Sequence, residues 1–101
     1  MRERDIENYL VKQAKACGGE VRKVRWLGRR GAPDRAVMLN HYDDAGYLVR
    51  GVTVWVELKA PGKKAEPHQE REHKRMRGMG QLVVVIDSIE GVDALLSGEG
   101  A

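Results

Sequence analysis

The clearest hydrophobic pattern in the chain lies between Val52 and Lys59, where apolar and polar positions alternate. One face of this segment is aliphatic and consists of Val52, Val54, Val56 and Leu58. Such alternation predicts a strand whose aliphatic face packs into a core. The opposite face ends with the carboxylate of Glu57 and the ammonium of Lys59. Because this charged pair interrupts an apolar strand, we expect it to mark a functional site.

Other segments have periodic patterns of their own. Apart from the strand already described, they predict a helix over 4–16, strands over 20–26 and 34–39, a helix over 67–77, a strand over 82–86 and a short helix capped by Asp87. The strand over 82–86 is uninterruptedly aliphatic, which is typical of burial on both faces. The strand–helix–strand order near the end predicts a crossover connection. We therefore expect an α/β fold, in the order α-β-β-β-α-β-α, with a mixed sheet flanked by helices.

The chain of 101 residues is long enough for one domain, over 1–101, with a modest core. No apolar run approaches the ~20 residues of a membrane helix, and the charged start does not resemble a signal peptide. Cys17 is the only cysteine, so no internal disulfide is possible and a reducing, cytoplasmic location is expected. Cys17 falls on the apolar stripe of the first helix, where we expect a small buried residue.

The net charge of +3 is modest, but the basic residues are clustered. They fall into three groups: Arg22, Lys23, Arg25, Arg29, Arg30 and Arg35; Lys59, Lys63 and Lys64; Lys74, Arg75 and Arg77. Basic groups near carboxylates suit a polyanion that approaches a metal site. The alternative is a solvated surface with scattered charges.

Asp34 is the second candidate acid. It follows Pro33, which can begin a strand but not lie centrally in one, so Asp34 is expected at a strand's start, across the sheet from Glu57. Two carboxylates can hold a divalent cation such as Mg²⁺ or Mn²⁺, and Lys59 can point at a phosphate beside it. The alternative is that Glu57 and Lys59 form an exposed ion pair worth ~0–1 kcal/mol.

Several other residues have two possible roles. Trp26 can belong to the core or stack on a nucleobase, and His73 can contact substrate or be partly buried and satisfied. His68 and His73 lack the partners and spacing of a zinc site. Asp43 and Asp44 precede Gly46 and are expected to form an exposed turn rather than to bind metal.

Two motifs, Pro33-Asp34 and Glu57-Leu58-Lys59, resemble those of the PD-(D/E)XK nuclease superfamily. The residues around them also match: Pro33-Asp34 lies in the run Gly28 to Arg35, and Pro67-His68-Gln69 follows the Glu57 strand. This order of motifs is similar to the VRR-NUC (virus-type replication-repair nuclease) family. The resemblance runs from about Arg4 to Leu96.

The resemblance implies a restriction-endonuclease-like core and metal-dependent hydrolysis of DNA phosphodiester bonds by Mg²⁺ or Mn²⁺. The implied cation ligands are Asp34, Glu57, the backbone carbonyl of Leu58 and, through water, Glu7 on the first helix. Lys59 is then expected to orient or deprotonate the attacking water, or to stabilise developing charge. Gln69 matches a signature glutamine of the family and is expected to position Lys59 or the water.

A short chain has little length for reading base edges. This favours structure-selective cleavage of branched DNA over a restriction-type endonuclease. The family association implies replication or repair in a phage or prophage, in the cytoplasm of a bacterium or infected cell. The residues expected to contact DNA are Arg29, Arg30, Arg35, Lys63 and Lys64.

A homodimer is also expected, because two sites would suit a two-fold junction. The last strand and helix are its candidate interface. The remaining alternative is a non-catalytic, basic nucleic-acid-binding module or decayed nuclease, against which the presence of all the expected polar positions argues.

Overall fold

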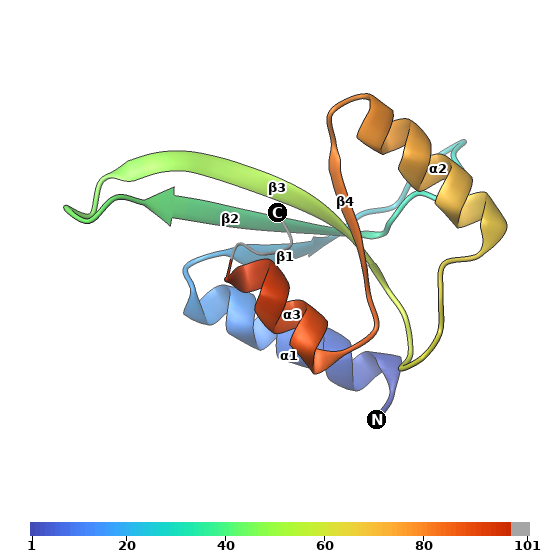
Figure 1. Ribbon diagram of the computed structural model, residues 1–101, viewed down its shortest axis with the longest axis horizontal. Helices are drawn as coiled ribbons and strands as arrows, with labels where there is room; N and C mark the ends of the chain where they lie inside the picture. Colours follow the sequence, from blue (N-terminus) through green and yellow to red (C-terminus); the bar gives the residue numbers. More distant parts are fainter. Residues whose placement is uncertain (98–101) are drawn as a thin grey trace.

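A four-stranded sheet with three helices forms the computed structural model, which describes residues 1–97 (Figure 1). In chain order the elements are α1 (Glu3–Ala16), β1 (Glu20–Lys23), β2 (Arg35–Tyr42), β3 (Leu48–Leu58), α2 (Pro67–Gly78), β4 (Leu82–Ile86) and α3 (Ile89–Leu96). The predicted α/β class and the order α-β-β-β-α-β-α are confirmed. No helix within residues 1–97 is both long and apolar enough to cross a membrane.

The sheet has the order β1-β2-β3-β4 and is mixed. β1, β2 and β3 run antiparallel, whereas β3 and β4 are parallel and are joined through α2. The β2–β3 hairpin extends well beyond the rest of the sheet (Figure 1). Its turn is held by Asp43, whose Oδ1 accepts hydrogen bonds from the backbone N–H groups of Ala45 and Tyr47. Asp43 is therefore a turn former, as its sequence context predicts.

The aliphatic face of β3 packs into the core, as predicted, and α1 and α3 cover it there. Val54, Val56 and Leu58 are buried there together with Ile6 and Leu10 of α1. α3 contributes Val92 and Leu95 to the same cluster. α2 lies against the other face of the sheet, the one that carries Glu57, and buries Glu72, His73 and Met76. The hydrophobic core and Glu57 are thus on opposite faces of one sheet.

Two predictions about strands are wrong. β1 ends at Lys23 rather than at Trp26, because the chain turns so that the indole N–H of Trp26 donates to the carbonyl of Pro33, at 2.7 Å. β4 lies at one edge of the sheet and is not buried on both faces: Leu82 and Val85 are each 37% exposed. An aliphatic run alone does not distinguish a central strand from an edge strand.

Two smaller expectations are also corrected. Cys17 is exposed, because α1 ends one residue earlier and Cys17 occupies its C-cap. Ser88, rather than Asp87, caps α3, and its hydroxyl accepts a hydrogen bond from the backbone N–H of Gly91 at 3.0 Å.

Candidate active site

Asp34 and Glu57 meet across the sheet. The β2–β3 register pairs Arg35 with Val56, so the next antiparallel pair beyond the strand end is Asp34 with Glu57. Lys59 follows two residues after Glu57 on the same face, and its backbone N–H donates to the carbonyl of Ile86 at 2.9 Å. Two acids and a lysine therefore lie together where β2 begins and where β3 and β4 end.

Glu57 is an unusual carboxylate because it is only 9% exposed. Burial, with the negative charge of Asp34 acting in the same direction, raises its pKa from 4.5 to about 7. Lys59 opposes this effect, and Glu3, in the first turn of α1, adds to it. The carboxylate is thus crowded by negative charge in a place where water compensates little.

Asp34 owes its position to contacts on either side of it in the chain. Its own carbonyl accepts a hydrogen bond from the N–H of Val24 at 2.9 Å, and the preceding Pro33 is fully buried. Gly31 packs directly on the start of α2, where a Cβ would lie 2.7 Å from the carbonyl oxygen of His68. The loop is therefore fixed to both β1 and α2, while the Asp34 side chain remains 59% exposed.

Glu7 reaches this site only through Arg35. The Arg35 Nε donates to Glu7 Oε2 at 2.6 Å, and its Nη1 lies 3.0 Å from Asp34 Oδ2. The Arg35 side chain is 12% exposed. The structure therefore places Arg35 between two acids and not on an open surface where phosphate would reach it.

His73 of α2 is the closest side chain to Glu57 that the sequence did not assign to the site. It is 1% exposed, and its Nε2 lies 3.9 Å from Glu57 Oε1 without a hydrogen-bond partner among the described residues. Burial and the charge of Arg77 lower its pKa, which favours the neutral ring. His73 also hydrogen-bonds the backbone of Gly31, so it connects α2 to the Asp34 loop.

Two predicted site residues have structural partners. Gln69 Oε1 accepts a hydrogen bond from the backbone N–H of Glu66 at 2.9 Å and so completes the N-terminal cap of α2. Arg29 donates through Nε to Glu72 Oε2, also at 2.9 Å. Although burial acts to raise the pKa of Glu72, hydrogen bonds from Arg29 and Arg75 outweigh it and lower that pKa. Arg30 is exposed.

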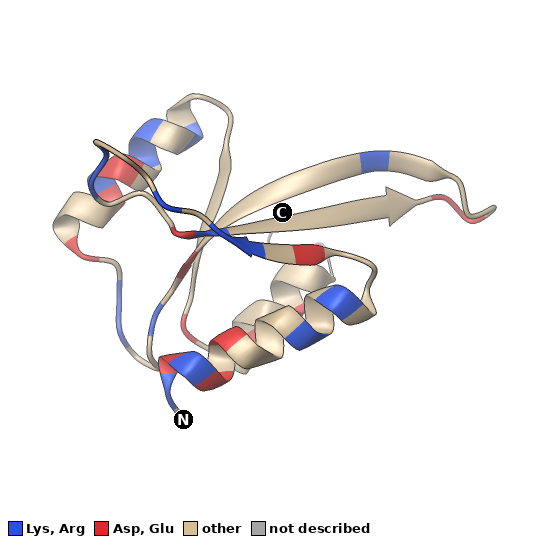
Figure 2. Ribbon diagram, turned by 180° about the vertical axis from the view of Figure 1, so that it is seen from behind, with Lys and Arg blue, Asp and Glu red and all other residues tan. Residues whose placement is uncertain are grey.

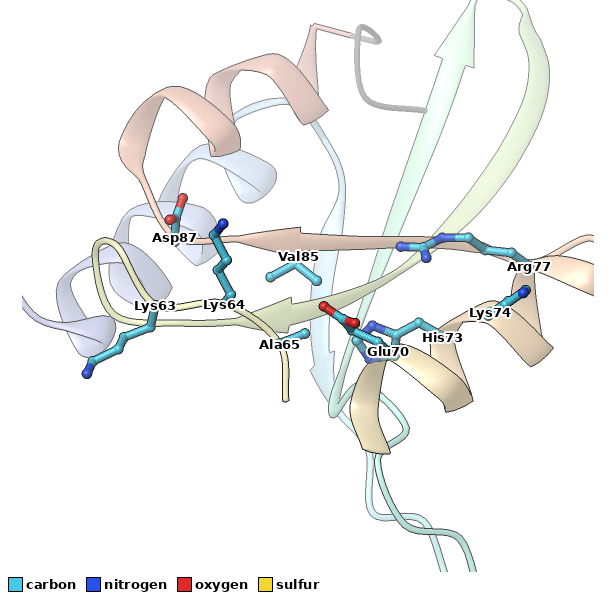
Figure 3. Close-up of a pocket in the computed structure, with 9 residues that line it drawn as sticks. All are labelled: Lys63, Lys64, Ala65, Glu70, His73, Lys74, Arg77, Val85 and Asp87. Atoms are coloured by element: carbon cyan, nitrogen blue, oxygen red, sulfur yellow. The ribbon is translucent and has the colours of Figure 1, made fainter. Parts of the chain in front are cut away.

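A basic hollow of about 540 Å³ adjoins His73 (Figure 3). Four cations, Lys63, Lys64, Lys74 and Arg77, line it against two carboxylates, Glu70 and Asp87, and Val85 of β4 lies at its centre. Basic residues also follow the connection between β1 and β2 (Figure 2). Lys63 and Lys64, which are predicted to contact DNA, thus line the same hollow as Lys74 and Arg77 of α2, which form a separate group in the sequence.

A ready-made cluster of three His, Cys, Asp or Glu side chains around one cation position does not occur within residues 1–97. Any cation between Asp34 and Glu57 would need backbone carbonyls, water or substrate oxygens to complete its shell. Leu58, whose carbonyl the family resemblance implicates, ends β3 between Glu57 and Lys59.

Known proteins match this chain over most of its length. A solved structure of a VRR_NUC domain has a TM-score of 0.75 and 40% sequence identity, with 94% of each chain covered. The p44 protein of Acyrthosiphon pisum secondary endosymbiont phage 1, named as a candidate nuclease, is 42% identical over 88 residues, which are 87% of this chain and 85% of p44. No protein-family model matches the chain.

The chain belongs to the VRR-NUC family. In this VRR-NUC domain Asp34 and Glu57 come together, as their expected places at strand ends predict. The sequence does not predict that Glu3 and His73 are also neighbours of Glu57. A signal for His73 was present in the sequence, because it shares a helical face with Gln69. Nothing in the sequence alone indicated that α1 begins beside the end of β3.

Replacing Gly31 tests the packing of the Asp34 loop. Both Gly31 and Gly28 have positive φ, +87° and +70°, so alanine at either position is strained by about 1–2 kcal/mol. Only at Gly31 does the new Cβ meet backbone; around Gly28 no described atom lies within 4 Å. We expect Gly31→Ala to lower the free energy of unfolding clearly more than Gly28→Ala in urea titrations. Equal losses would show that the close approach to α2 is unimportant.

The pKa of Glu57 predicts a pH dependence of stability in metal-free protein. Folded Glu57 keeps its proton up to about pH 7, whereas the unfolded chain loses it near 4.5. The free energy of unfolding should therefore fall as pH rises through this window. Glu57→Gln removes the fall and should gain roughly 2–3 kcal/mol on wild type between about pH 4 and pH 8. Urea titrations with EDTA measure this difference, and parallel curves for the two proteins would contradict it.

Proposed function

We propose that this VRR-NUC protein hydrolyses phosphodiester bonds in DNA with the help of Mg²⁺ or Mn²⁺. The observation that carries the proposal is the meeting of Asp34 with the buried Glu57, whose pKa is raised by burial and by Asp34. Two carboxylates that repel each other at the surface of a fold are stabilised when a cation lies between them.

The donor set fits a hard cation. Asp34 and Glu57 offer carboxylate oxygens and Leu58 a backbone carbonyl, and oxygen donors with several waters are what Mg²⁺ prefers. When bound, the cation supplies charge neutralisation and an activated water. Glu7 supports this arrangement from outside, because it orients Arg35, which in turn contacts Asp34.

Lys59 is proposed as the catalytic cation of the protein itself. Its charge lowers the pKa of Glu57, so it lies near that carboxylate, and its side chain is partly buried. An ammonium in this place can hold a phosphate oxygen or the attacking water and stabilise the charge that develops in the transition state. Gln69 contributes indirectly by fixing the start of α2, against which the Asp34 loop packs.

The proposed DNA path follows the basic hollow. Lys63 and Lys64 are exposed at its edge, and exposed lysines attract the phosphate backbone without reading sequence. Arg30 is exposed near Asp34 in the chain, whereas Arg29 and Arg35 are already paired with Glu72 and Glu7. We therefore assign the larger part of phosphate binding to Arg30 and the two lysines.

Branched DNA is the proposed substrate, in the replication or repair of a phage or prophage genome. The seven described elements all build the sheet and its cover, which leaves little for reading base edges in a groove. The similarity to a phage protein supports the proposed setting.

Cleavage of a labelled four-way junction tests the catalytic assignment. Asp34→Asn and Lys59→Ala should each reduce the rate by about 100-fold or more, with Mg²⁺ or Mn²⁺ present. Lys59→Ala should keep its affinity for Mn²⁺ in calorimetry, because lysine is not a ligand. Asp44→Asn, in the exposed hairpin turn, is the matched control and should cleave normally.

The outcomes separate the alternatives. Full cleavage in excess EDTA, or by Asp34→Asn, would overturn the cation site. Tight DNA binding without cleavage under any of these conditions would make the protein a non-catalytic binding module.

Salt dependence of DNA binding tests the lysine contacts. Each phosphate contact contributes about 0.9 to the slope of log affinity against log salt concentration. If Lys63 and Lys64 each neutralise one phosphate, the slope of the double alanine variant should be smaller by nearly two units. The double variant of Lys12 and Lys15, on α1, removes the same charge from the other side of the sheet. Equal slopes for both double variants would place the DNA elsewhere.

A homodimer remains part of the proposal, with a changed interface. Val92 and Leu95 of α3 are used in the core, so α3 has little apolar surface to offer a partner. The projecting β2–β3 hairpin instead exposes large apolar side chains: Tyr42, Tyr47, Leu48 and Val49. A second copy that covers this hairpin would remove them from water.

Light scattering at micromolar concentration should give the mass of a dimer. Replacing Leu48 and Val49 by serine should give a folded monomer, since neither side chain belongs to the core. A wild-type protein that stays monomeric, with or without junction DNA, would contradict the dimer.

A further inference from the structure

Both tryptophans of the chain line one shallow hollow at the end of α2. Trp26 and Trp55 have ring centroids 5.2 Å apart at an interplanar angle of 56°, and both are half-buried. The hollow between them and the end of α2 has a volume of about 290 Å³, near the lower limit of the ~300–1,000 Å³ of small-ligand sites. Met76 and Met79 complete its apolar wall, and Met79 is 67% exposed.

Each tryptophan is linked through the backbone to one of the proposed catalytic acids. The Trp26 indole donates to the carbonyl of Pro33, the residue before Asp34. Trp55 precedes Glu57 by two residues on the same face of β3, a spacing of about 7 Å along a strand. That distance is close to one nucleotide step, so a phosphate held at the acids would place a neighbouring nucleotide over the tryptophans.

The rim of the hollow carries polar groups that fit a base. Gln81 accepts a hydrogen bond from the Trp55 indole through Oε1 at 2.9 Å. The amide N–H₂ group of Gln81 takes no part in this hydrogen bond. Arg29 also lines the hollow, and its guanidinium is held by Glu72. The basic connection between β1 and β2 runs past the same region and favours a polyanionic ligand (Figure 2).

We propose that the hollow lined by Trp26, Trp55 and the end of α2 binds one unpaired nucleobase of the DNA substrate, next to the cleaved phosphate. The proposal rests on the proposed nuclease function and adds the substrate feature that is recognised. A base paired inside a duplex presents only its edges, whereas an unpaired base offers its face to an aromatic ring, and such stacking tolerates any base. Selectivity for flaps and other branched DNA with unpaired nucleotides then requires no reading of sequence, whereas a fully paired four-way junction would be held through its phosphates alone.

Intrinsic fluorescence tests the proposal directly, because the chain has only these two tryptophans. The protein is titrated in EDTA, so that no cleavage occurs, with a single strand, a flap junction and a fully paired duplex of equal charge. We expect strong quenching by the first two DNAs and little by the duplex. A flap with abasic sites at its unpaired positions should bind through its phosphates but quench weakly. Equal quenching by all four DNAs would overturn the proposal.

Variants extend the test to affinity. Trp55→Leu should weaken binding of the flap by on the order of tenfold or more, and binding of the duplex should be unchanged. Trp55→Phe, which keeps a stacking ring, should restore most of the loss and serves if the leucine variant is unstable. Tyr47→Leu removes an exposed aromatic ring on the hairpin arm and should not alter the preference for the flap.

The results distinguish this proposal from the proposed function. Flap-selective quenching by a protein that never cleaves DNA would leave the base site standing and remove the nuclease. Metal-dependent cleavage with no difference between flap and abasic flap, in quenching or affinity, would leave the nuclease standing and remove the base site.

Discussion

The burial of the Glu57 carboxylate next to Asp34 is the constraint on which the rest of the site depends. A carboxylate out of water is stabilised only by a proton, a cation or hydrogen-bond donors. Here the pKa is raised to about 7 by burial and by Asp34, while Lys59 offsets only part of this effect. The fold therefore keeps a group that is unfavourable on its own, and such groups are characteristic of sites whose partner arrives with the ligand.

The fold can accommodate the buried Glu57 carboxylate because the two faces of the sheet have different roles. One face builds the core with α1 and α3 and supplies the stability. The other face is covered by α2, whose His73 closes over Glu57 and whose first turn supports Gly31, and by the connection that carries Trp26. Since β3 and β4 are parallel, α2 must cross the sheet between them, and this crossover delivers both the imidazole and the basic hollow.

Much of the fold and the pairing of the acids could be predicted from the sequence, because both depend on local patterns. The alternation in β3 determines which residues face the core, and a proline places Asp34 at the start of its strand. The approach of Glu3 and His73 to Glu57 depends instead on helix packing between distant segments. The pairing of Arg35 with Glu7 depends on the same packing between distant segments. The sequence does not reveal it, because an arginine in a basic run has the same sequence signature whether it is paired or free.

The edge position of β4 and the joining of the two tryptophans show the same limit. Five aliphatic residues indicate a strand but not its neighbours. The sequence alone leaves Trp26 as either a core residue or a stacking platform, and only the fold shows that Trp55 lies beside it. Pairwise placement across the sheet, rather than residue type, decides what these side chains can do.

The most direct test of the account is the pKa of Glu57 itself, measured by carboxyl ¹³C NMR with and without Mg²⁺. The account predicts a midpoint near 7 in metal-free protein, a lower midpoint in Asp34→Asn, and a carboxylate that stays ionised well below that pH when Mg²⁺ is bound. A midpoint near the ordinary 4.5, or one that Mg²⁺ leaves unchanged, would contradict the claim that Asp34 and Glu57 form a cation site.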